Sequence, residues 1–277
     1  MNLLSFDTIR TYVGNTSSLP PAVGYSRDIQ LGSLKILTEF DRICREHNLS
    51  YFLFAGTLLG AVRHGGFVPW DDDVDVIMPR QDYERIIEIY NQHNQIPGLK
   101  ALRYTYPKGI WNLIKVQHTE IPSLFIDIFP SDFYYKQLSI KENEELSNTL
   151  KQLIVDHVQG QSTWPSAEVF HHSFMELALE KLPALKPLPD VKPMLMYGPE
   201  YLHATVKYWA YDYDMVFPLR PIQFEGHTFL GPNDPDLCLT LHYGDYMRLP
   251  TSLHMHTNLD QMPMEEILAI KKFIRTK

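Results

Sequence analysis

Two aspartates lie within and just before an apolar run that is typical of a buried β-strand. The run reads Val74-Asp75-Val76-Ile77-Met78, and Asp73 comes two residues before Asp75. Because side chains alternate between the two faces of a strand, Asp73 and Asp75 are expected on the same face. A buried carboxylate is costly without a partner, and two neighbouring carboxylates also repel one another. A bound divalent cation is the simplest explanation, and these oxygen ligands suit Mg²⁺, with Mn²⁺ as the alternative.

A third carboxylate is expected to join this pair from a later strand. Asp127 lies in the apolar run Leu124-Phe125-Ile126-Asp127-Ile128-Phe129. If this strand pairs beside that of residues 73–78, then Asp73, Asp75 and Asp127 form a three-carboxylate site. We therefore predict these three residues as metal ligands and as catalytic groups. Asp71 and Asp72 complete the acidic run, and a solvated acidic turn explains them equally well.

The segment before the aspartates is predicted to bind phosphate. An apolar run over 51–55 indicates a strand, and Gly56-Thr57 then forms a turn that leads into a short helix. The N–H groups at the start of a helix favour phosphate. A GTLLG run alone is more often only a tight turn, so its value comes from the aspartates that follow it.

Positive and aromatic side chains near these motifs are expected to complete the binding site. Arg63 and His64 end the short apolar segment, and Lys115 lies in the middle of a predicted strand. We expect Arg63 and Lys115 to contact phosphate, a role that is compatible with an ion pair to a nearby aspartate. His64 is explained equally well as a surface residue. Candidates for an aromatic box around a quaternary ammonium are Trp70, Trp111, Tyr243 and Tyr246, although core packing explains any one of them.

Periodicity and turn residues predict both helices and strands along the chain. The expected helices cover 28–47, 79–94, 137–160, 166–182, 200–210, 234–242 and 264–274. The expected strands cover 51–55, 74–78, 101–106, 111–117 and 123–129, and a hairpin over 222–229 turns at Glu225-Gly226. Asp28 and Asp234 are the expected caps of their helices. Residues 183–193 hold four prolines and are expected to form a loop.

Composition narrows the functional classes. The 277 residues carry a formal net charge of −8, which argues against nucleic-acid binding. The two cysteines, Cys44 and Cys238, lie far apart and outside any metal-type spacing, which is typical of a reduced cytoplasmic protein. No apolar run reaches the roughly 18 residues of a membrane span. We therefore expect a cytoplasmic protein with at most peripheral membrane contact, at the inner face.

The order of these motifs resembles the nucleotidyltransferase fold, and the residues themselves are similar to the LicD family. The similar segments are GTLLGAVRHGGFVPWDDDVDVIMPRQDYERI (56–86), FIDIFPSD (125–132), FEG (224–226) and YGDYMRLP (243–250). The resemblance implies an α+β fold with a nucleotidyltransferase-like mixed β-sheet core flanked by helices. The expected parts are an irregular arm (1–27), the catalytic core (28–134), a helical insertion or acceptor-side region (135–200) and a helical and hairpin part that completes the fold (201–277).

The LicD resemblance also implies a metal-dependent phosphotransferase. The family includes bacterial phosphocholine transferases and is related to fukutin-type ribitol-phosphate transferases. The implied reaction moves a phospho-alcohol, phosphocholine in the first place, from a CDP-activated donor such as CDP-choline to a hydroxyl of a cell-surface glycan, such as lipopolysaccharide or teichoic acid, or of its lipid-linked precursor. CMP is released. By position, Asp73 and Asp75 match the metal-binding pair, Asp127 the third carboxylate, and Gly56 and Thr57 the phosphate-side turn.

Other functions stay open at this point. A nucleotidyltransferase that uses an NTP would release pyrophosphate in place of CMP. A binding protein without turnover has no need of costly clustered carboxylates, and a glycosyltransferase with an Asp-x-Asp motif leaves Gly56-Thr57 and Asp127 unexplained. Two histidine clusters favour no metal site, because neighbours such as His171-His172 face apart on a helix and His254-Met255-His256 lacks a third ligand.

Overall fold

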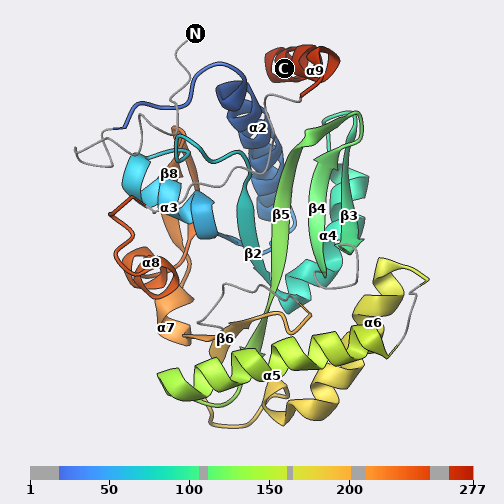
Figure 1. Ribbon diagram of the computed structural model, residues 1–277, viewed down its shortest axis with the longest axis vertical. Coiled ribbons are helices and arrows are strands. Elements are labelled where there is room, and N and C mark those ends of the chain that lie inside the picture. The colour runs from blue at the N-terminus through green and yellow to red at the C-terminus, as the bar shows by residue number, and fades with distance from the viewer. Residues whose placement is uncertain (1–18, 106–111, 161–164, 201–209, 250–261, 277) are drawn as a thin grey trace.

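Helices surround a mixed β-sheet in the computed structural model of the chain, an α+β architecture that is described for residues 19–105, 112–160, 165–200, 210–249 and 262–276 (Figure 1). The sheet contains β1 (Phe52–Leu53), β2 (Asp75–Pro79), β3 (Leu99–Thr105), β4 (Asn112–His118), β5 (Ile121–Tyr134), β6 (Met194–Tyr197) and β7 (Ala210–Asp212). A separate hairpin is formed by β8 (Arg220–Phe224) and β9 (His227–Gly231). The helices are α2 (Tyr25–Glu46), α3 (Ala55–His64), α4 (Arg80–His93), α5 (Ile140–Gln159), α6 (Ala167–Lys181), α7 (Tyr213–Val216), α8 (Pro235–Tyr243) and α9 (Met264–Arg275), with a 3-10 turn at Pro183–Leu185.

The long strand β5 organises the sheet. The strand order is β1-β2-β5-β4-β3, and β6 pairs with the end of β5 and with β7. The pairing of β2 with β5 is parallel, whereas the other described pairings in this sheet are antiparallel. The parallel register aligns Asp75 with Asp127, so the predicted neighbourhood of these two strands is confirmed.

The two faces of the sheet have different cover. Val76, Ile128 and Val116 point into the main apolar core, together with buried residues of α2 and α4, which lie on that face (Figure 1). On the opposite face Asp75, Asp127 and Lys115 form one row across β2, β5 and β4. This second face carries its own apolar cluster farther along, where α5 and β6 pack against the strands. The alternation therefore separates a core face from a face that carries charged groups.

The start of α3 differs from the sequence expectation. Residues 51–55 do not form a five-residue strand, because β1 contains only Phe52 and Leu53. Phe54 is the N-cap of α3, so Gly56 and Thr57 lie in the first turn of this helix, and the prediction of a separate Gly-Thr turn is wrong. Asp28 is not a cap either: Gly24 precedes α2, and Asp28 lies in the first helical turn. The Asp234 cap of α8 is confirmed by its bond from the Leu237 N–H.

Three short elements were not expected from the sequence: β6, β7 and α7. The strand β6 follows the proline-rich segment, and it forms because the second half of β5 offers it a pairing edge. Residues 201–209 of the predicted helix 200–210 lie outside the described residues. Within the part of the chain that is described, no helix is both long and apolar enough to cross a membrane.

Candidate active site

A row of three charged side chains forms the centre of the candidate site. Asp75 on β2 is aligned with Asp127 on β5, and Asp127 is aligned with Lys115 on β4. The Lys115 ammonium lies 2.7 Å from Oδ1 of Asp127 and 3.8 Å from the centre of the Phe125 ring. Lys115 and Asp127 are both largely buried. The expected ion pair of Lys115 with a nearby aspartate is therefore present.

Asp71 and Asp73 add two more carboxylates from the segment just before β2. Asp73 was expected in the same strand as Asp75, but β2 begins at Asp75 and Asp73 precedes it. The Asp73 carboxylate is nevertheless near enough to raise the pKa of Asp75. The carboxylate of Asp71 lies against Gly56: a Cβ at residue 56 would be only 2.5 Å from Oδ2 of Asp71. This Oδ2 atom is buried and has no hydrogen-bond partner among the described residues. Local sequence does not distinguish Asp71 from a residue of a solvated turn, because only the approach of α3 brings its carboxylate inward.

The cluster lacks positive charge in proportion to its carboxylates. Burial, and then the carboxylates of Asp73 and Asp127, raise the pKa of Asp75 well above its usual value, and Lys115 opposes this only in part. Burial, followed by Asp73 and Asp72, likewise raises the pKa of Asp71. Such shifts mean that an added cation would stabilise the ionised carboxylates.

The carboxylate oxygens suit a hard divalent ion, but among the described residues they do not form a complete set of protein ligands for one. In the described parts of the chain, no three His, Cys, Asp or Glu side chains are arranged so that they could hold a metal ion. Mg²⁺ commonly takes only one or two carboxylates together with water and substrate phosphates. The buried, unpartnered Oδ2 of Asp71 beside Asp73 is consistent with that incomplete type of site. The assignment of Asp73, Asp75 and Asp127 as joint ligands stays a prediction.

Thr57 and Gly56 shape the site from the first turn of α3. The hydroxyl oxygen of Thr57 accepts a hydrogen bond of 2.9 Å from the backbone N–H of Asp75, and Thr57 is fully buried. This bond ties the start of β2 to the helix. Gly56 leaves the space that the Asp71 carboxylate occupies. The residues preceding the strand thus hold the aspartates in place, and their predicted contact with phosphate stays a prediction.

Arg63, His64 and Trp70 lie together at the end of α3. The guanidinium of Arg63 donates from Nη1 to the Tyr246 carbonyl at 2.6 Å and from Nε to Nδ1 of His64 at 3.4 Å. Its Cζ lies 6.0 Å from the Trp70 ring. Arg63 is only 4% exposed, burial lowers its pKa, and Nη2 has no hydrogen-bond partner among the described residues. A buried donor without a partner is unusual, and an anionic ligand would satisfy it.

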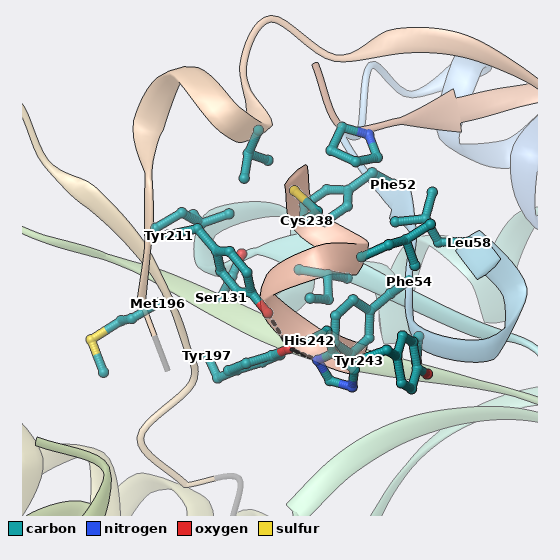
Figure 2. A pocket seen from close by; sticks show the side chains of 16 residues that line it. Phe52, Phe54, Leu58, Ser131, Met196, Tyr197, Tyr211, Cys238, His242 and Tyr243 are labelled. Atoms are coloured by element: carbon teal, nitrogen blue, oxygen red, sulfur yellow. Dashed lines mark hydrogen bonds between the residues drawn. The ribbon is translucent and has the colours of Figure 1, made fainter. Parts of the chain in front are cut away.

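An apolar pocket lies between α3, α8 and the end of the sheet (Figure 2). Its cavity volume is about 20 Å³, which is room for little more than one water molecule. Its aromatic lining consists of Phe52, Phe54, Tyr197, Tyr211, His242 and Tyr243. Tyr197 is hydrogen-bonded to the Tyr211 hydroxyl at 3.0 Å and to Nδ1 of His242 at 3.4 Å. The pKa of Tyr243 is raised by burial of its hydroxyl and then by the carboxylates of Asp75 and Asp71, although much of the residue is exposed. Tyr243 therefore connects the pocket to the carboxylates.

The structure changes the expected aromatic box. Of the three aromatic candidates among the described residues only Tyr243 lines the pocket, whereas Trp70 accompanies Arg63 and the Tyr246 hydroxyl is bonded to Asp236. Trp111 and the histidines at 254 and 256 lie outside the described residues. The sequence offered no signal for Tyr197 and Tyr211, because both belong to the short strands β6 and β7 that it did not predict.

Asp75 and Asp127 on adjacent parallel strands, with the start of α3 beside β2, agree with the arrangement that the nucleotidyltransferase resemblance implies. The sequence comparisons agree, because residues 48–184 match the family model described as LicD/FKTN/FKRP, nucleotidyltransferase domain. The chain belongs to the LicD family. Two other motifs of the resemblance, 224–226 and 243–250 (described up to residue 249), contact α3 or the loop after it: Glu225 accepts from the Phe67 N–H, and the Tyr246 carbonyl accepts from Arg63.

Three relatives extend this match to different degrees. The chain is 26% identical over 254 residues to the lipopolysaccharide cholinephosphotransferase LicD of Haemophilus influenzae, covering 81% of this chain and 92% of that protein. It is 29% identical over 115 residues to an uncharacterized protein of Rickettsia typhi, covering 38% of this chain and 36% of that protein. It is 32% identical over 87 residues to the human ribitol 5-phosphate transferase FKRP, covering 29% of this chain but only 16% of that protein.

Proposed function

We propose that this protein is a phosphotransferase that moves phosphocholine from CDP-choline, or a similar phospho-alcohol from its CDP donor, to a hydroxyl of a cell-surface glycan or its lipid-linked precursor, with release of CMP. The observation that carries the proposal is the buried carboxylate cluster, short of positive charge, directly beside an aromatic pocket. The H. influenzae relative, whose match spans most of both chains, is named as a lipopolysaccharide cholinephosphotransferase. The free Cys44 and Cys238 fit a reaction on the cytoplasmic side, at the inner face of the membrane.

In this proposal Asp73 and Asp75, with Asp71 beside them, would hold Mg²⁺ or Mn²⁺. The raised pKa of Asp75 and the unpartnered oxygen of Asp71 support this assignment, because a cation bound there would stabilise the ionised carboxylates. When bound, the ion would supply charge neutralisation for the diphosphate under attack. The bond from its N–H to Thr57 holds the backbone of Asp75 in place at the start of β2.

Lys115 and Arg63 would bind the donor phosphates from two sides. The Lys115 ammonium lies between Asp127 and the Phe125 ring, and the buried guanidinium of Arg63 has a donor to spare. Asp127 would orient Lys115 through their 2.7 Å contact and take the proton of the acceptor hydroxyl on a carboxylate oxygen. Phosphoryl transfer depends mainly on such positioning and charge, so no covalent intermediate is required of the chain.

The aromatic pocket would take the trimethylammonium group of choline after its side chains move apart, because its present volume of about 20 Å³ admits little more than one water molecule. Aromatic faces attract quaternary ammonium ions, and the carboxylates next to Tyr243 add negative potential on the same side. Only one oxygen and two carbons separate the phosphorus from the nitrogen in phosphocholine, so the two subsites must be adjacent, as the pocket and the carboxylates are. A polyol such as ribitol would instead leave hydroxyl groups unpaired against an apolar lining, at a cost in free energy.

The test is a donor panel with two by-products measured. The protein is incubated with Mg²⁺, a glycan acceptor and CDP-choline, CDP-ethanolamine, CDP-ribitol, CDP-glycerol or CTP, and CMP and pyrophosphate are followed. We expect CMP from CDP-choline, less from CDP-ethanolamine, and loss of the reaction in Asp75→Asn. Pyrophosphate from CTP without CMP from any CDP-alcohol would refute the proposal and establish a nucleotidyltransferase. An Asp127→Asn variant with near wild-type turnover would remove Asp127 from any essential role.

A further inference from the structure

The Phe-Glu-Gly motif of the β8–β9 hairpin does not belong to the carboxylate cluster, yet it contacts the loop that leads to the aspartates. Glu225 lies at the hairpin turn with a positive φ of 51°. Its backbone N–H donates to the Gly65 carbonyl at 2.9 Å, and its Oε1 accepts from the Phe67 N–H at 3.0 Å. One residue therefore fixes both sides of Gly66 in the segment between α3 and the aspartates.

There is no room for a side chain at position 66, because the Glu225 carboxylate occupies the space where one would lie. A Cβ at residue 66 would be 2.4 Å from Oε1 and 2.9 Å from Cδ of Glu225. The loop and the glutamate are therefore in direct contact, and any larger residue at position 66 must displace one of them. This contact links a turn near the C-terminal end of the chain to the glycine pair ahead of the aspartates.

Arg27 on α2 fixes the Glu225 carboxylate from the other side. Its guanidinium donates two parallel bonds, from Nη1 to Oε1 at 2.9 Å and from Nη2 to Oε2 at 2.7 Å. Bidentate pairing sets direction as well as charge, which a lysine does not reproduce. Although partial burial works to raise it, the guanidinium and the Phe67 N–H hold the pKa of Glu225 below its usual value. Glu225 is therefore ionised whenever the loop is in this position at neutral pH.

Gln30 extends the same contact to the aspartates. Its amide oxygen accepts a bond of 3.2 Å from Arg27, and its amide nitrogen donates to the carbonyls of Val68 at 3.2 Å and Asp71 at 2.8 Å. Gln30 is 1% exposed, so loss of these bonds would leave buried polar groups unsatisfied. A continuous set of hydrogen bonds thus runs from Glu225 through Arg27 and Gln30 to the backbone of Asp71.

We propose that Glu225, Arg27 and Gln30 form a positioning latch that holds residues 65–71 and thereby sets the place of the Asp71 carboxylate beside Asp73 and Asp75. These are positioning residues, because none of them touches the carboxylates themselves. The inference rests on the proposed function for one measurement only, the turnover of the donor. A misplacement of about 1 Å at a reacting group can cost on the order of 100-fold in rate, so the latch affects catalysis without contacting a ligand.

The test compares Glu225→Ala, Glu225→Gln, Arg27→Met and the double variant Arg27→Met/Glu225→Ala with a matched control. The control is Arg45→Ala, which also removes a contact of 3.0 Å between α2 and this hairpin, at the Thr228 carbonyl, but leaves the loop untouched. Three measurements are made on each full-length protein: amide hydrogen exchange of residues 65–75, the dissociation constant for Mn²⁺, and kcat and KM with the donor.

We expect faster exchange over 65–75, weaker Mn²⁺ binding and a kcat lowered roughly 10- to 100-fold for Glu225→Ala and Arg27→Met, with Arg45→Ala unchanged in all three. The double variant should match the single variants, because the pair acts as a unit. Glu225→Gln keeps the shape and should fall in between, which separates the latch from a failure to fold. Wild-type exchange and Mn²⁺ affinity in Glu225→Ala would overturn the inference. Absence of transferase activity in the wild type would refute the proposed function alone, since exchange and Mn²⁺ binding still test the latch.

Discussion

Replacing Arg80 by methionine should destabilise the protein more than a substitution at an ordinary ion pair. Arg80 opens α4 directly after β2, and its guanidinium contacts three carboxylates, those of Glu200, Asp132 and, at 3.1 Å, Glu84. It donates to Glu200 at 2.6 and 2.8 Å and to Asp132 at 3.0 and 2.6 Å. Glu200 is 0% exposed and the Asp132 side chain 12% exposed, so neither carboxylate can turn to water when the arginine is removed.

The size of the effect follows from what Arg80→Met leaves behind. Removing one partner of a buried ion pair typically costs about 3–5 kcal/mol, because the remaining charge is buried without compensation. For a chain of this size that corresponds to a fall in the unfolding midpoint of roughly 6–20 °C. His171 on α6 lies 3.4 Å from the same Glu200, so the loss should also loosen α6 from the core.

Urea unfolding followed by circular dichroism at pH 7 measures this loss. Arg85→Ala on the same helix is the control: Arg85 is 49% exposed with a 3.4 Å contact to Asp82, and its loss should change the free energy of unfolding by less than about 0.5 kcal/mol. Adding Glu200→Gln to Arg80→Met should recover part of the stability, because the uncompensated charge is removed. A loss below about 1 kcal/mol in Arg80→Met, or no recovery in the double variant, would refute the reasoning.

Three further predictions concern the carboxylates and the titration of the Arg80 network. Asp75→Asn should lower kcat by roughly 10²–10³-fold yet raise the thermal midpoint, since one repelling carboxylate is removed; turnover and calorimetry measure the two effects. Gly56→Ala should lower kcat by about 10-fold or more, because the new Cβ would lie 2.5 Å from Asp71 Oδ2 and displace it. The stability contributed by Glu84 and His171 should be fully present between about pH 4.5 and 6.5. Although burial opposes the shift, hydrogen bonds to Glu200 and Glu84 raise the pKa of His171 above its usual 6.5, so its contribution to stability is lost as the pH rises through that raised pKa. Again against the effect of burial, the pKa of Glu84 is lowered from 4.5 to about 2, so its contribution is lost as the pH falls between those values. Urea unfolding across this range checks the assignment, and His171→Gln should flatten the alkaline side.

Much of the sheet follows from local sequence, and the site follows only in part. Alternation predicts that Asp75 and Asp127 face away from the core, and apolar runs predict β2 to β5, because each signal is contained in a few neighbouring residues. The position of Asp71 is different, since it depends on how α3 approaches the loop and on the space left by Gly56. The strand β6 lacks a local signal as well, because it is stabilised by the far half of β5. Contacts between distant segments therefore account for what the sequence did not predict.

The distribution of charge explains why so many restraints surround the aspartates. The cluster lowers the free energy of unfolding, because burial and mutual repulsion disfavour the ionised carboxylates and raise the pKa values of Asp71 and Asp75. In addition, a buried oxygen of Asp71 has no hydrogen-bond partner among the described residues. Repulsion between the carboxylates favours an outward movement of the loop that carries them unless other elements hold the loop in place. Thr57 holds the start of β2, and the residues of the latch hold the loop before it, through bonds that come from α3, α2 and the β8–β9 hairpin. Strain concentrated at one site and rigidity around it are expected together where a protein must present charges ready for a ligand.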